Sequence, residues 1–332
     1  MTDAALATLS TLEKSNALFI RYPRLEELHR KICRCQKASK LANEPECMAL
    51  EGVTGAGKST LVRDEYAAQF KSYMTPSGLI IPVLYVEMPS PATVKIAASA
   101  MLEAMGDPAA HHGTVGVLDS RLVNLIRECQ VELVILDEFS NLIDTETDRV
   151  LAKVSDWLKM LIKRTRIPFL VVGIDGKVER ILQANSQLSR LFAMRETLEP
   201  FRWDWQDKTA VEAFNTFVAT AETRIGKPLE TSISRADMLY RVFYATNGVV
   251  GNVMNLLRYS VILAEEKSSS ILELPTLAQA FNERLAKHVG KVNPFDAPTQ
   301  APFVAPVEKP SEPKSVKGRK KAPSLAETLR AS

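Results

Sequence analysis

The stretch that decides the fold is Glu51-Gly52-Val53-Thr54-Gly55-Ala56-Gly57-Lys58-Ser59-Thr60, which fits the phosphate-loop pattern G-x-x-x-x-G-K-[ST] without a mismatch. Gly55 and Gly57 allow the backbone to turn tightly and to bring its N–H groups against phosphate oxygens. Lys58 would reach the β- and γ-phosphates as a point charge, and the Ser59 hydroxyl would help to hold Mg²⁺. The segment therefore predicts a binding site for ATP and Mg²⁺.

The residues around this loop favour the same interpretation over a glycine-rich turn that binds no ligand. A short apolar run, 48–50, precedes the loop and is typical of a buried strand. Apolar residues at helical spacing follow it, which predicts a helix from Ser59 to about Phe70 whose N-terminus favours anions. The ATP-binding residues expected here are Gly52, Thr54, Gly55, Ala56, Gly57, Lys58, Ser59 and Thr60.

Composition sets wide limits on the rest of the chain. Its 332 residues are enough for one large or two ordinary domains, and 46% hydrophobic residues can form a substantial core. The formal net charge of +3 excludes a polybasic protein, so any basic surface must be local. We find no apolar run of transmembrane length and no signal pattern, and the four scattered cysteines predict neither a disulfide framework nor a zinc site. The expected compartment is a bacterial cytoplasm.

Alternating apolar runs and helical periods predict an α/β fold with a parallel sheet covered by helices on both faces. The expected strands are 48–50, 80–86, 131–138, 168–173 and 196–201, and the helices between them are 24–40, 59–70, 92–105, 115–129, 147–165 and 177–185. We expect four parts: a lead-in at 1–23, an ATPase core at 24–204, a small helical lid at 205–290 and a tail at 291–332. Seven of the 18 prolines lie in 294–323 together with six basic residues, so the tail is expected to be disordered.

A second motif, Asp137-Glu138, closes an apolar strand downstream of the phosphate loop. A carboxylate at the C-terminal end of a strand in an open α/β sheet points into the ligand crevice. Asp137 is the expected partner of Mg²⁺, and Glu138 is placed to polarise a water for attack on the γ-phosphate. The paired carboxylates fit a hydrolase better than a kinase, which needs a base that faces a substrate hydroxyl.

Both motifs, with a helical region behind the sheet, resemble the AAA+ ATPases. The resemblance implies an arginine finger supplied by a neighbouring subunit, with Arg190 as the first candidate and Arg195 as the second. It implies a polar sensor after the fourth strand, for which Asp175 is the candidate. The segment 246–254 resembles the second sensor helix but lacks the arginine of many members; Arg258 lies one turn later and is expected to fall short, which favours slow hydrolysis. Tyr22 and Pro23 are expected to border the adenine.

The succession of motifs along residues 15–270 is similar to that of the TniB/TnsC family of transposon-encoded AAA+ regulators. Its specific part is Gln187-Leu188-Ser189-Arg190-Leu191-Phe192 followed by Leu198-Glu199-Pro200-Phe201. The resemblance implies an ATPase that assembles as a ring or helical filament on duplex DNA. It also implies that the assembly takes a signal from a TniQ-type target-selection protein, in some cases with an RNA-guided complex, recruits the transposase, and is reset by hydrolysis.

Contacts to DNA are expected at phosphates, because a target regulator must work at many sequences. By the same resemblance, Thr93 and Lys95 match the DNA-contacting place after the second strand, and Lys153, Lys159 and Lys163 are further candidates on the long helix. The alternative for each lysine is an ordinary solvated face. The segment Trp203-Asp204-Trp205 is interpreted as a domain junction and not as a base reader.

Three alternative functions remain open from the sequence. A helicase-loader or replication-type AAA+ ATPase would share every catalytic residue. A small-molecule kinase would share the phosphate loop. A structural DNA-coating protein would bind ATP only to hold the assembly together.

Overall fold

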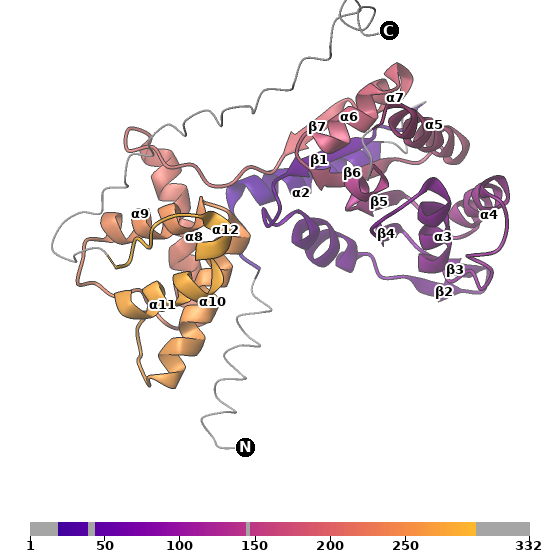
Figure 1. Cartoon of the computed structure of the whole chain (residues 1–332). Coiled ribbons are helices and arrows are strands. Elements are labelled where there is room, and N and C mark those ends of the chain that lie inside the picture. The colour runs from indigo at the N-terminus through magenta and orange to yellow at the C-terminus, as the bar shows by residue number, and fades with distance from the viewer. Residues whose placement is uncertain (1–18, 39–43, 144–146, 297–332) are drawn as a thin grey trace, which may run out of the picture.

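The computed structural model describes residues 19–38, 44–143 and 147–296 (Figure 1). The predicted disordered tail after residue 296 and the lead-in before residue 19 lie outside this range. Within it, no helix combines the length and the apolar content that a bilayer span requires.

A five-stranded parallel sheet forms the centre of the α/β part, in the order β4-β5-β6-β1-β7. The strands β5 and β6 are buried except at Ile174, the last residue of β6, which agrees with their continuous apolar sequence. This arrangement confirms the predicted parallel sheet. The strands are β1 (Met48–Gly52), β4 (Val83–Glu87), β5 (Leu133–Asp137), β6 (Phe169–Ile174) and β7 (Met194–Thr197).

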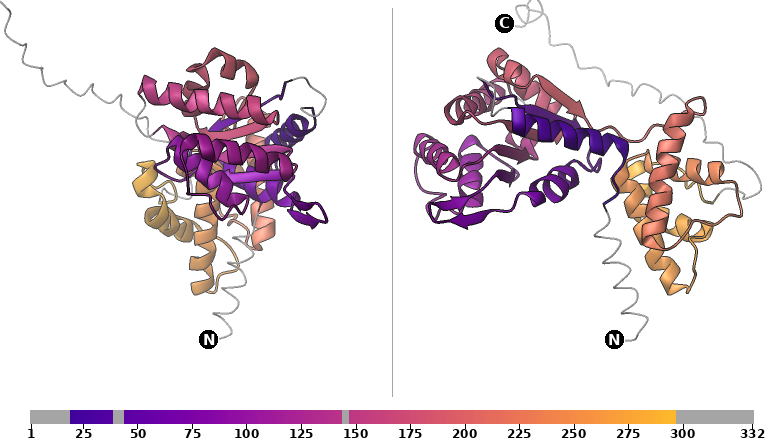
Figure 2. Two further views of the ribbon diagram at one scale, coloured as in Figure 1. Left: turned by 90° about the vertical axis from the view of Figure 1, so that its right-hand side faces the viewer. Right: turned by 180° about the vertical axis from the view of Figure 1, so that it is seen from behind.

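Alternate residues of each strand enter two different cores, because successive side chains of a strand point to opposite faces. On β5, Val134 and Leu136 pack in the larger core, whereas Leu133 and Ile135 pack in the smaller one. The larger core is closed by α3 (Val94–Ala104), α4 (Val115–Glu128), α5 (Asp148–Thr165), α6 (Lys177–Gln183) and α7 (Ser186–Leu191). The smaller core is closed by α2 (Pro23–Ala38) and the helix that follows the phosphate loop (Figure 2).

The helix after the phosphate loop has about the predicted limits but is less regular than predicted. It runs as a π-helix over Thr60–Tyr66 and a single 3₁₀ turn over Ala67–Gln69. A small antiparallel hairpin of β2 (Tyr73–Thr75) and β3 (Gly78–Ile80), which the sequence analysis missed, comes next.

Two predicted strands have different limits in the structure. The predicted strand 80–86 is divided at Pro82, which has no N–H to donate to a ladder; its first residue closes the hairpin and β4 begins at Val83. The predicted strand 196–201 begins two residues earlier and ends at Thr197. Past Pro200 the chain bonds to the helical part instead, where the N–H of Phe201 donates to the carbonyl of Gly248 at 2.9 Å.

The C-terminal part of the described chain is helical and has a hydrophobic core of its own. Its helices are α8 (Lys208–Ile225), α9 (Arg235–Thr246), α10 (Val250–Glu266), α11 (Leu274–Arg284) and α12 (Ala286–Val289). Figure 1 shows this helical lid beside the C-terminal ends of the strands, joined to the sheet by the segment after β7. A cavity lies where the lid meets the phosphate loop.

Candidate nucleotide-binding site

The cavity between the phosphate loop and the lid has a volume of about 420 Å³. Four parts of the chain line it: the phosphate loop with the helix after it (54–60 and 63–64), the N-terminal residues 19, 20 and 25, Phe217 of α8, and one side of α10. Glu138 reaches it from the end of β5. All but one of the predicted ATP-binding loop residues therefore line one cavity. The exception is Gly52, whose carbonyl accepts a hydrogen bond from Nζ of Lys58.

The loop has the backbone geometry that its glycines predict. Gly55 and Gly57 have φ values of +80° and +100°, in the left-handed region that favours glycine. The carbonyl of Gly55 accepts a hydrogen bond of 2.8 Å from the N–H of Gly251, at the start of α10. A Cβ on Gly251 would lie 2.8 Å from that oxygen, so this contact between lid and loop depends on a residue without a side chain.

Lys58 is buried at the centre of the loop, with 6% of its surface exposed. Its Nζ donates to the carbonyls of Gly52 at 2.8 Å and Val53 at 3.0 Å. Burial lowers the pKa of Lys58, and the nearby carboxylates of Glu138 and Asp137 oppose that shift. A phosphate group in the cavity would supply further negative charge and favour the ammonium form that binds it.

Asp137 ends β5 and is 1% exposed. Its Oδ2 accepts a hydrogen bond of 2.9 Å from the Tyr85 hydroxyl on β4, and its Oδ1 accepts one of 2.9 Å from the backbone N–H of Glu138. Two donors hold the carboxylate in one orientation and leave lone pairs on both oxygens for a further ligand.

Glu138 lines the cavity from a left-handed backbone conformation with a φ of 51°. This conformation turns the chain out of the sheet at the point where the apolar strand ends. Burial raises the pKa of Glu138, and the carboxylates of Asp137 and Glu87 add to the effect, while Lys58 opposes it. A raised pKa brings a carboxylate nearer to the range in which a general base works well.

The side chains beside the loop fit the donor set that Mg²⁺ prefers. The Ser59 hydroxyl makes no capping hydrogen bond to the helix that it precedes. Together with the Asp137 carboxylate it offers oxygen ligands of the kind that hold Mg²⁺ beside nucleotide phosphates. Ser59 and Asp137 would thus hold the ion, whose chemistry would be to neutralise charge on the phosphoryl oxygens.

The far end of the cavity is apolar and suits a nucleobase. Phe19, Ile20 and Leu25 line it from the N-terminal side, and Phe217 and Met254 line it from the lid. The Arg224 side chain on α8 donates a 2.6 Å hydrogen bond to the carbonyl of Phe19, which ties this segment to the lid. These contacts come from distant parts of the chain, so no local pattern could have identified them.

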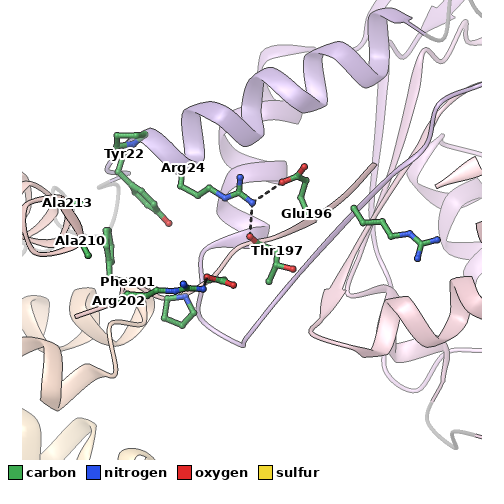
Figure 3. Close-up of a pocket in the computed structure, with 12 residues that line it drawn as sticks. Tyr22, Arg24, Glu196, Thr197, Phe201, Arg202, Ala210 and Ala213 are labelled. Atoms are coloured by element: carbon green, nitrogen blue, oxygen red, sulfur yellow. Dashed lines mark hydrogen bonds and ion pairs between the residues drawn. The ribbon is translucent and has the colours of Figure 1, made fainter. Parts of the chain in front are cut away.

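Tyr22 and Pro23 do not border this cavity, which corrects the sequence-based expectation. They line a second cavity of about 570 Å³ between the start of α2, β7 and α8. Figure 3 shows the Tyr22 ring directed toward Phe201, with ring centroids 5.0 Å apart. Burial raises the pKa of Tyr22 to about 12. The cavity is lined instead by Phe19 and Ile20, two and three residues before Tyr22, and by Leu25 in the first turn of α2.

Arg258 does line the nucleotide cavity, contrary to the expectation that it falls short. Gly251, Met254 and Arg258 are three and four residues apart on α10 and therefore share one face of the helix. Burial lowers the pKa of the Arg258 guanidinium. The lid thus places an arginine at the nucleotide cavity, although at a position different from the one the family pattern suggests.

Asp175, the sensor candidate, is exposed after β6 and is not among the residues that line the cavity. Its charge nevertheless reaches Lys58, whose ammonium form it favours. Next to it, the N–H of Ile174 donates to the Ser140 hydroxyl at 2.9 Å, which links the ends of β6 and β5.

A family model described as bacterial TniB protein matches residues 12–203. The chain belongs to the TniB family. Among curated proteins, none matches it.

Several solved structures share the AAA+ ATPase fold of this TniB chain. ORC1 of Aeropyrum pernix, in complex with DNA, matches with a TM-score of 0.55 at 16% identity, over 80% of this chain and 66% of that one. Aeropyrum pernix ORC2 matches with a TM-score of 0.57 at 18% identity, over 82% and 70%. Cdc6p from Pyrobaculum aerophilum matches with a TM-score of 0.58 at 16% identity, over 82% and 71%. At these identities the likeness concerns the fold alone.

The two candidate arginine fingers of the TniB chain lie apart from its own nucleotide cavity. Arg190, on α7, is 72% exposed and contacts Glu44 at 3.0 Å. Arg195, on β7, is tied down: it pairs with Glu179 and donates to the Phe192 carbonyl at 2.9 Å and to the Ser189 hydroxyl at 2.6 Å. Neither arginine lines the cavity of its own chain.

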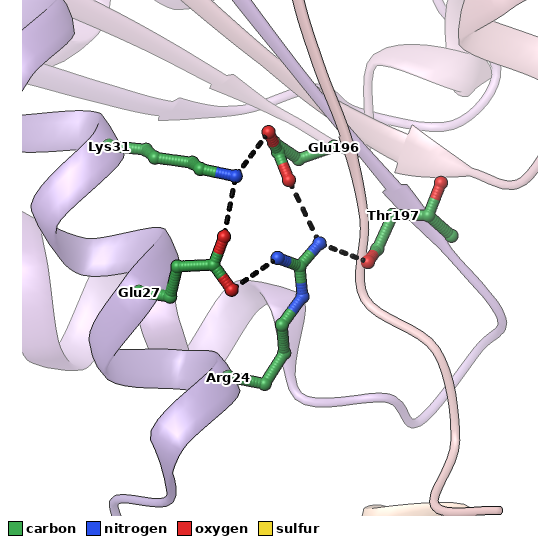
Figure 4. Close-up of polar contacts among 5 residues, drawn as sticks. All are labelled: Arg24, Glu27, Lys31, Glu196 and Thr197. Carbon is green, nitrogen blue, oxygen red and sulfur yellow. Dashed lines mark hydrogen bonds and ion pairs between the residues drawn. The ribbon is translucent and has the colours of Figure 1, made fainter.

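An ion-pair network holds β7, the edge strand that contains Arg195. Figure 4 shows Arg24 and Lys31 of α2 converging on Glu196 of β7, at 2.9 and 2.7 Å, and both also contact Glu27. Arg24 also donates to the Thr197 carbonyl at 3.0 Å. Lys31 and Arg24 lower the pKa of Glu27 to about 2. The hydrogen bonds of Lys31 to Glu196 and Glu27 raise the pKa of Lys31. Burial lowers the pKa of Arg24, but its hydrogen bonds to Glu27 and Glu196 outweigh burial, so its pKa is raised. The network fixes α2 against β7.

The candidate DNA contacts fall into two groups. Thr93 caps α3 by accepting a hydrogen bond from the N–H of Ile96, and Lys95 is exposed in the first turn of that helix. On α5, Lys153 is exposed, but Lys159 pairs with Asp156 at 2.8 Å and Lys163 donates to Gln187 at 3.2 Å. Thr93 and Lys95 thus lie where a helix N-terminus adds to the attraction for phosphate.

Proposed function

We propose that this chain is an ATP-dependent regulator of DNA transposition. ATP binding drives oligomerisation on duplex DNA, the oligomer connects target-site selection to transposase recruitment, and hydrolysis resets it. The selector would be a TniQ-type protein, in some systems with an RNA-guided complex. Membership of the TniB family supports this proposal.

One observation carries the oligomeric part of the proposal. Lys58, Ser59 and Glu138 face one cavity, whereas Arg190 is exposed on α7 and does not line that cavity. Charge on a transferring phosphoryl group needs a guanidinium close to it for fast hydrolysis. Subunits arranged head to tail in a ring or filament would bring Arg190 of one copy to the nucleotide of the next.

The reaction proposed for the site is hydrolysis of ATP to ADP and phosphate. Glu138 would accept a proton from the attacking water, Lys58 would hold the β- and γ-phosphates, and Asp137 would orient Mg²⁺. Arg258 would contact the nucleotide from the lid, so that bound nucleotide holds the lid against the phosphate loop. Asp175 contributes negative charge near Lys58 and is the candidate sensor.

Contact with DNA is proposed at Thr93 and Lys95, with Lys153, Lys159 and Lys163 as further candidates. The exposed N-terminus of α3 supports the first pair. The solved DNA complex of Aeropyrum pernix ORC1 shows that a protein of this fold binds DNA.

Negative-stain microscopy with duplex DNA tests the proposal directly. Samples with ATP and Mg²⁺, without nucleotide, and with a Lys58→Ala variant are compared. Rings or filaments that require ATP and are missing in the variant are the expected result. Monomers that respond to neither ATP nor DNA would overturn the proposal. A Glu138→Gln variant then separates a regulator from a passive coat, since a regulator locked in the ATP form stays assembled.

A further inference from the structure

The lid carries three aromatic rings that form a partly exposed surface, which we call the aromatic ledge: Trp203, Trp205 and Tyr240. The centroid of the Trp203 ring lies 5.0 Å from that of Trp205 and 5.3 Å from that of Tyr240, and Trp205 lies 5.3 Å from Tyr240. Trp205 is 61% exposed. An indole so open to water, resting on two other rings, is typical of a binding surface.

The ledge is fixed to the lid core from below. The Trp203 ring packs against Phe243 at 5.6 Å and Phe214 at 6.1 Å, and Phe214 is fully buried. The indole N–H of Trp203 has no acceptor among the described residues. The rings are therefore held in place before any ligand binds, which reduces the entropy lost on docking.

The described chain ends beside the helix that carries part of this ledge. The Lys291 ammonium lies 4.3 Å from the centroid of Tyr244, which is one helical turn after Tyr240 on the same face of α9. The carbonyl of Pro294 accepts a 2.5 Å hydrogen bond from Arg241 on the same helix. Phe295 is buried in the lid core against Phe281. The described chain thus ends next to α9 (Figure 1).

The sequence after this point has the composition that aromatic surfaces bind. Five prolines occur in residues 298–313, at positions 298, 302, 306, 310 and 313. Proline-rich segments favour the polyproline II conformation, which loses little entropy on docking in aromatic-lined grooves. At about 3.1 Å per residue, even the first few residues span more than one helical turn of α9, about 5.4 Å.

One charge contact is available to the same pairing, because residues 298–313 carry Lys309 beside Glu308 and Glu312. Asp204 lies between the two tryptophans and is exposed, and its carboxylate accepts only a local hydrogen bond from the N–H of Gln206 among the bonds of the described residues. Lys309 and Lys314 flank the last two prolines of the segment. A lysine on a docked segment would meet negative charge beside the rings.

We propose that the proline-rich segment 298–313 of the same chain docks on the aromatic ledge. The docked segment places the basic residues that follow it, from Lys314 to Lys321, at the lid surface next to the segment that joins the lid to β7. The inference does not depend on the proposed transposition function.

Acrylamide quenching of tryptophan fluorescence tests this in the full-length chain. Trp157 is 7% exposed and Trp203 is half-buried, so Trp205 dominates the quenching when nothing covers it. Replacing the five prolines by alanine should raise the quenching slope by roughly two-fold, because an indole that was covered becomes open to solvent. The matched control carries Thr299→Ala and Ser311→Ala in the same segment and should quench as the wild type does.

The same proline replacement in a Trp205→Phe chain tests whether the change in quenching comes from the aromatic ledge. In a Trp205→Phe chain, the five-proline replacement should leave the slope unchanged. The effect should be independent of protein concentration over a roughly 100-fold range, as expected for docking within one chain. An unchanged slope in the five-proline variant, an equal rise in the Trp205→Phe background, or dependence on concentration would each overturn the proposal.

Discussion

The hydroxyl of Tyr85 donates a 2.9 Å hydrogen bond to Oδ2 of Asp137, across the neighbouring strands β4 and β5. Burial and the Asp137 charge raise the pKa of the tyrosine, so it stays a donor throughout the neutral range. The side chain of one strand thus orients the carboxylate that would hold Mg²⁺ at the end of the next.

Tyr85→Phe removes this donor and keeps the ring. A hydrogen bond to a charged group contributes about 1.5–3 kcal/mol, so the turnover of ATP should fall by about ten-fold or more. The Mg²⁺ concentration needed for half-maximal turnover should rise, while the Kd for nucleotide without Mg²⁺ should not change. The control is Tyr73→Phe on the exposed hairpin. Equal effects of the two changes would contradict a positioning role.

The raised pKa of Glu138 predicts a pH dependence of hydrolysis. The base must be ionised, so turnover should fall as the pH decreases through a value above the ordinary range of a glutamate. Glu87→Gln removes one of the carboxylates that raise this pKa, so the acid limb of the pH profile should move to lower pH.

Glu138→Gln should lose turnover by roughly 10²- to 10⁴-fold and retain ATP binding.

The raised pKa of Glu138 also makes the stability of the fold depend on pH. Because the folded-state pKa of Glu138 is raised, stability decreases as the pH rises from the ordinary glutamate pKa to the folded-state value. When the two proteins are compared at the same pH, Glu138→Gln should therefore have the same Tm as wild type in acid. At neutral pH the variant should have the higher Tm. Thermal unfolding without nucleotide at both pH values checks this; a lower neutral Tm for the variant would contradict it.

Arg258→Ala tests whether the lid takes part in hydrolysis. Removing a cationic donor that faces the nucleotide should lower turnover by roughly 10- to 100-fold. Lys267→Ala, at the end of the same helix, is the matched control, since Lys267 contacts Gln279 and does not line the cavity. Unchanged turnover in both variants would show that the lid arginine is only structural.

Glu196→Gln tests the network between α2 and β7. Its carboxylate is the shared partner of Arg24 and Lys31 and is 14% exposed, so its loss should lower the free energy of unfolding by about 1 kcal/mol. Glu199→Gln breaks the exposed pair with Arg202 and should have no measurable effect. Urea unfolding of the two variants decides between a structural network and an incidental surface contact.

The sequence was sufficient for the parallel sheet and for the group of residues, 54–60 and Glu138, that lines one cavity. Apolar runs such as 133–137 are buried on both faces, and Asp137 and Glu138 follow directly from the end of that run. The helix period placed α5 to within a residue at its start. These features depend on contacts that are local in the chain or repeat along it.

The remaining features depend on tertiary contacts that a single sequence does not encode locally. Arg258 reaches the cavity because Gly251 lets α10 approach the phosphate loop within hydrogen-bond distance. Phe19 and Ile20 line the cavity in place of the expected Tyr22, which packs against Phe201 instead. Pro82 interrupts the apolar run 80–86, which was predicted to be a single strand. The roles of Arg190 and Arg195, as well as those of Asp175 and the DNA-facing lysines, stay predictions.

Arg190 and Arg195 differ in a way that separates a finger from a structural arginine. Arg195→Ala breaks bonds to Glu179, Ser189 and Phe192, so it should lower the free energy of unfolding by about 1–3 kcal/mol. Arg190→Ala removes an exposed side chain and should leave stability unchanged, while turnover on DNA should fall on the order of 10³-fold.

Mixing two inactive variants shows whether the finger acts between subunits. Arg190→Ala subunits keep Glu138, and Glu138→Gln subunits keep Arg190, so each active interface needs one subunit of each kind in the correct order. Random mixing of equal amounts should restore about a quarter of the wild-type turnover, because half of the sites keep the base and half of their neighbours supply the arginine. Recovery in the mixture, with neither variant active alone, identifies Arg190 as a finger contributed by the neighbouring copy. If the mixture is as inactive as its components while both variants still assemble on DNA, the guanidinium acts elsewhere and Arg195 becomes the next residue to test.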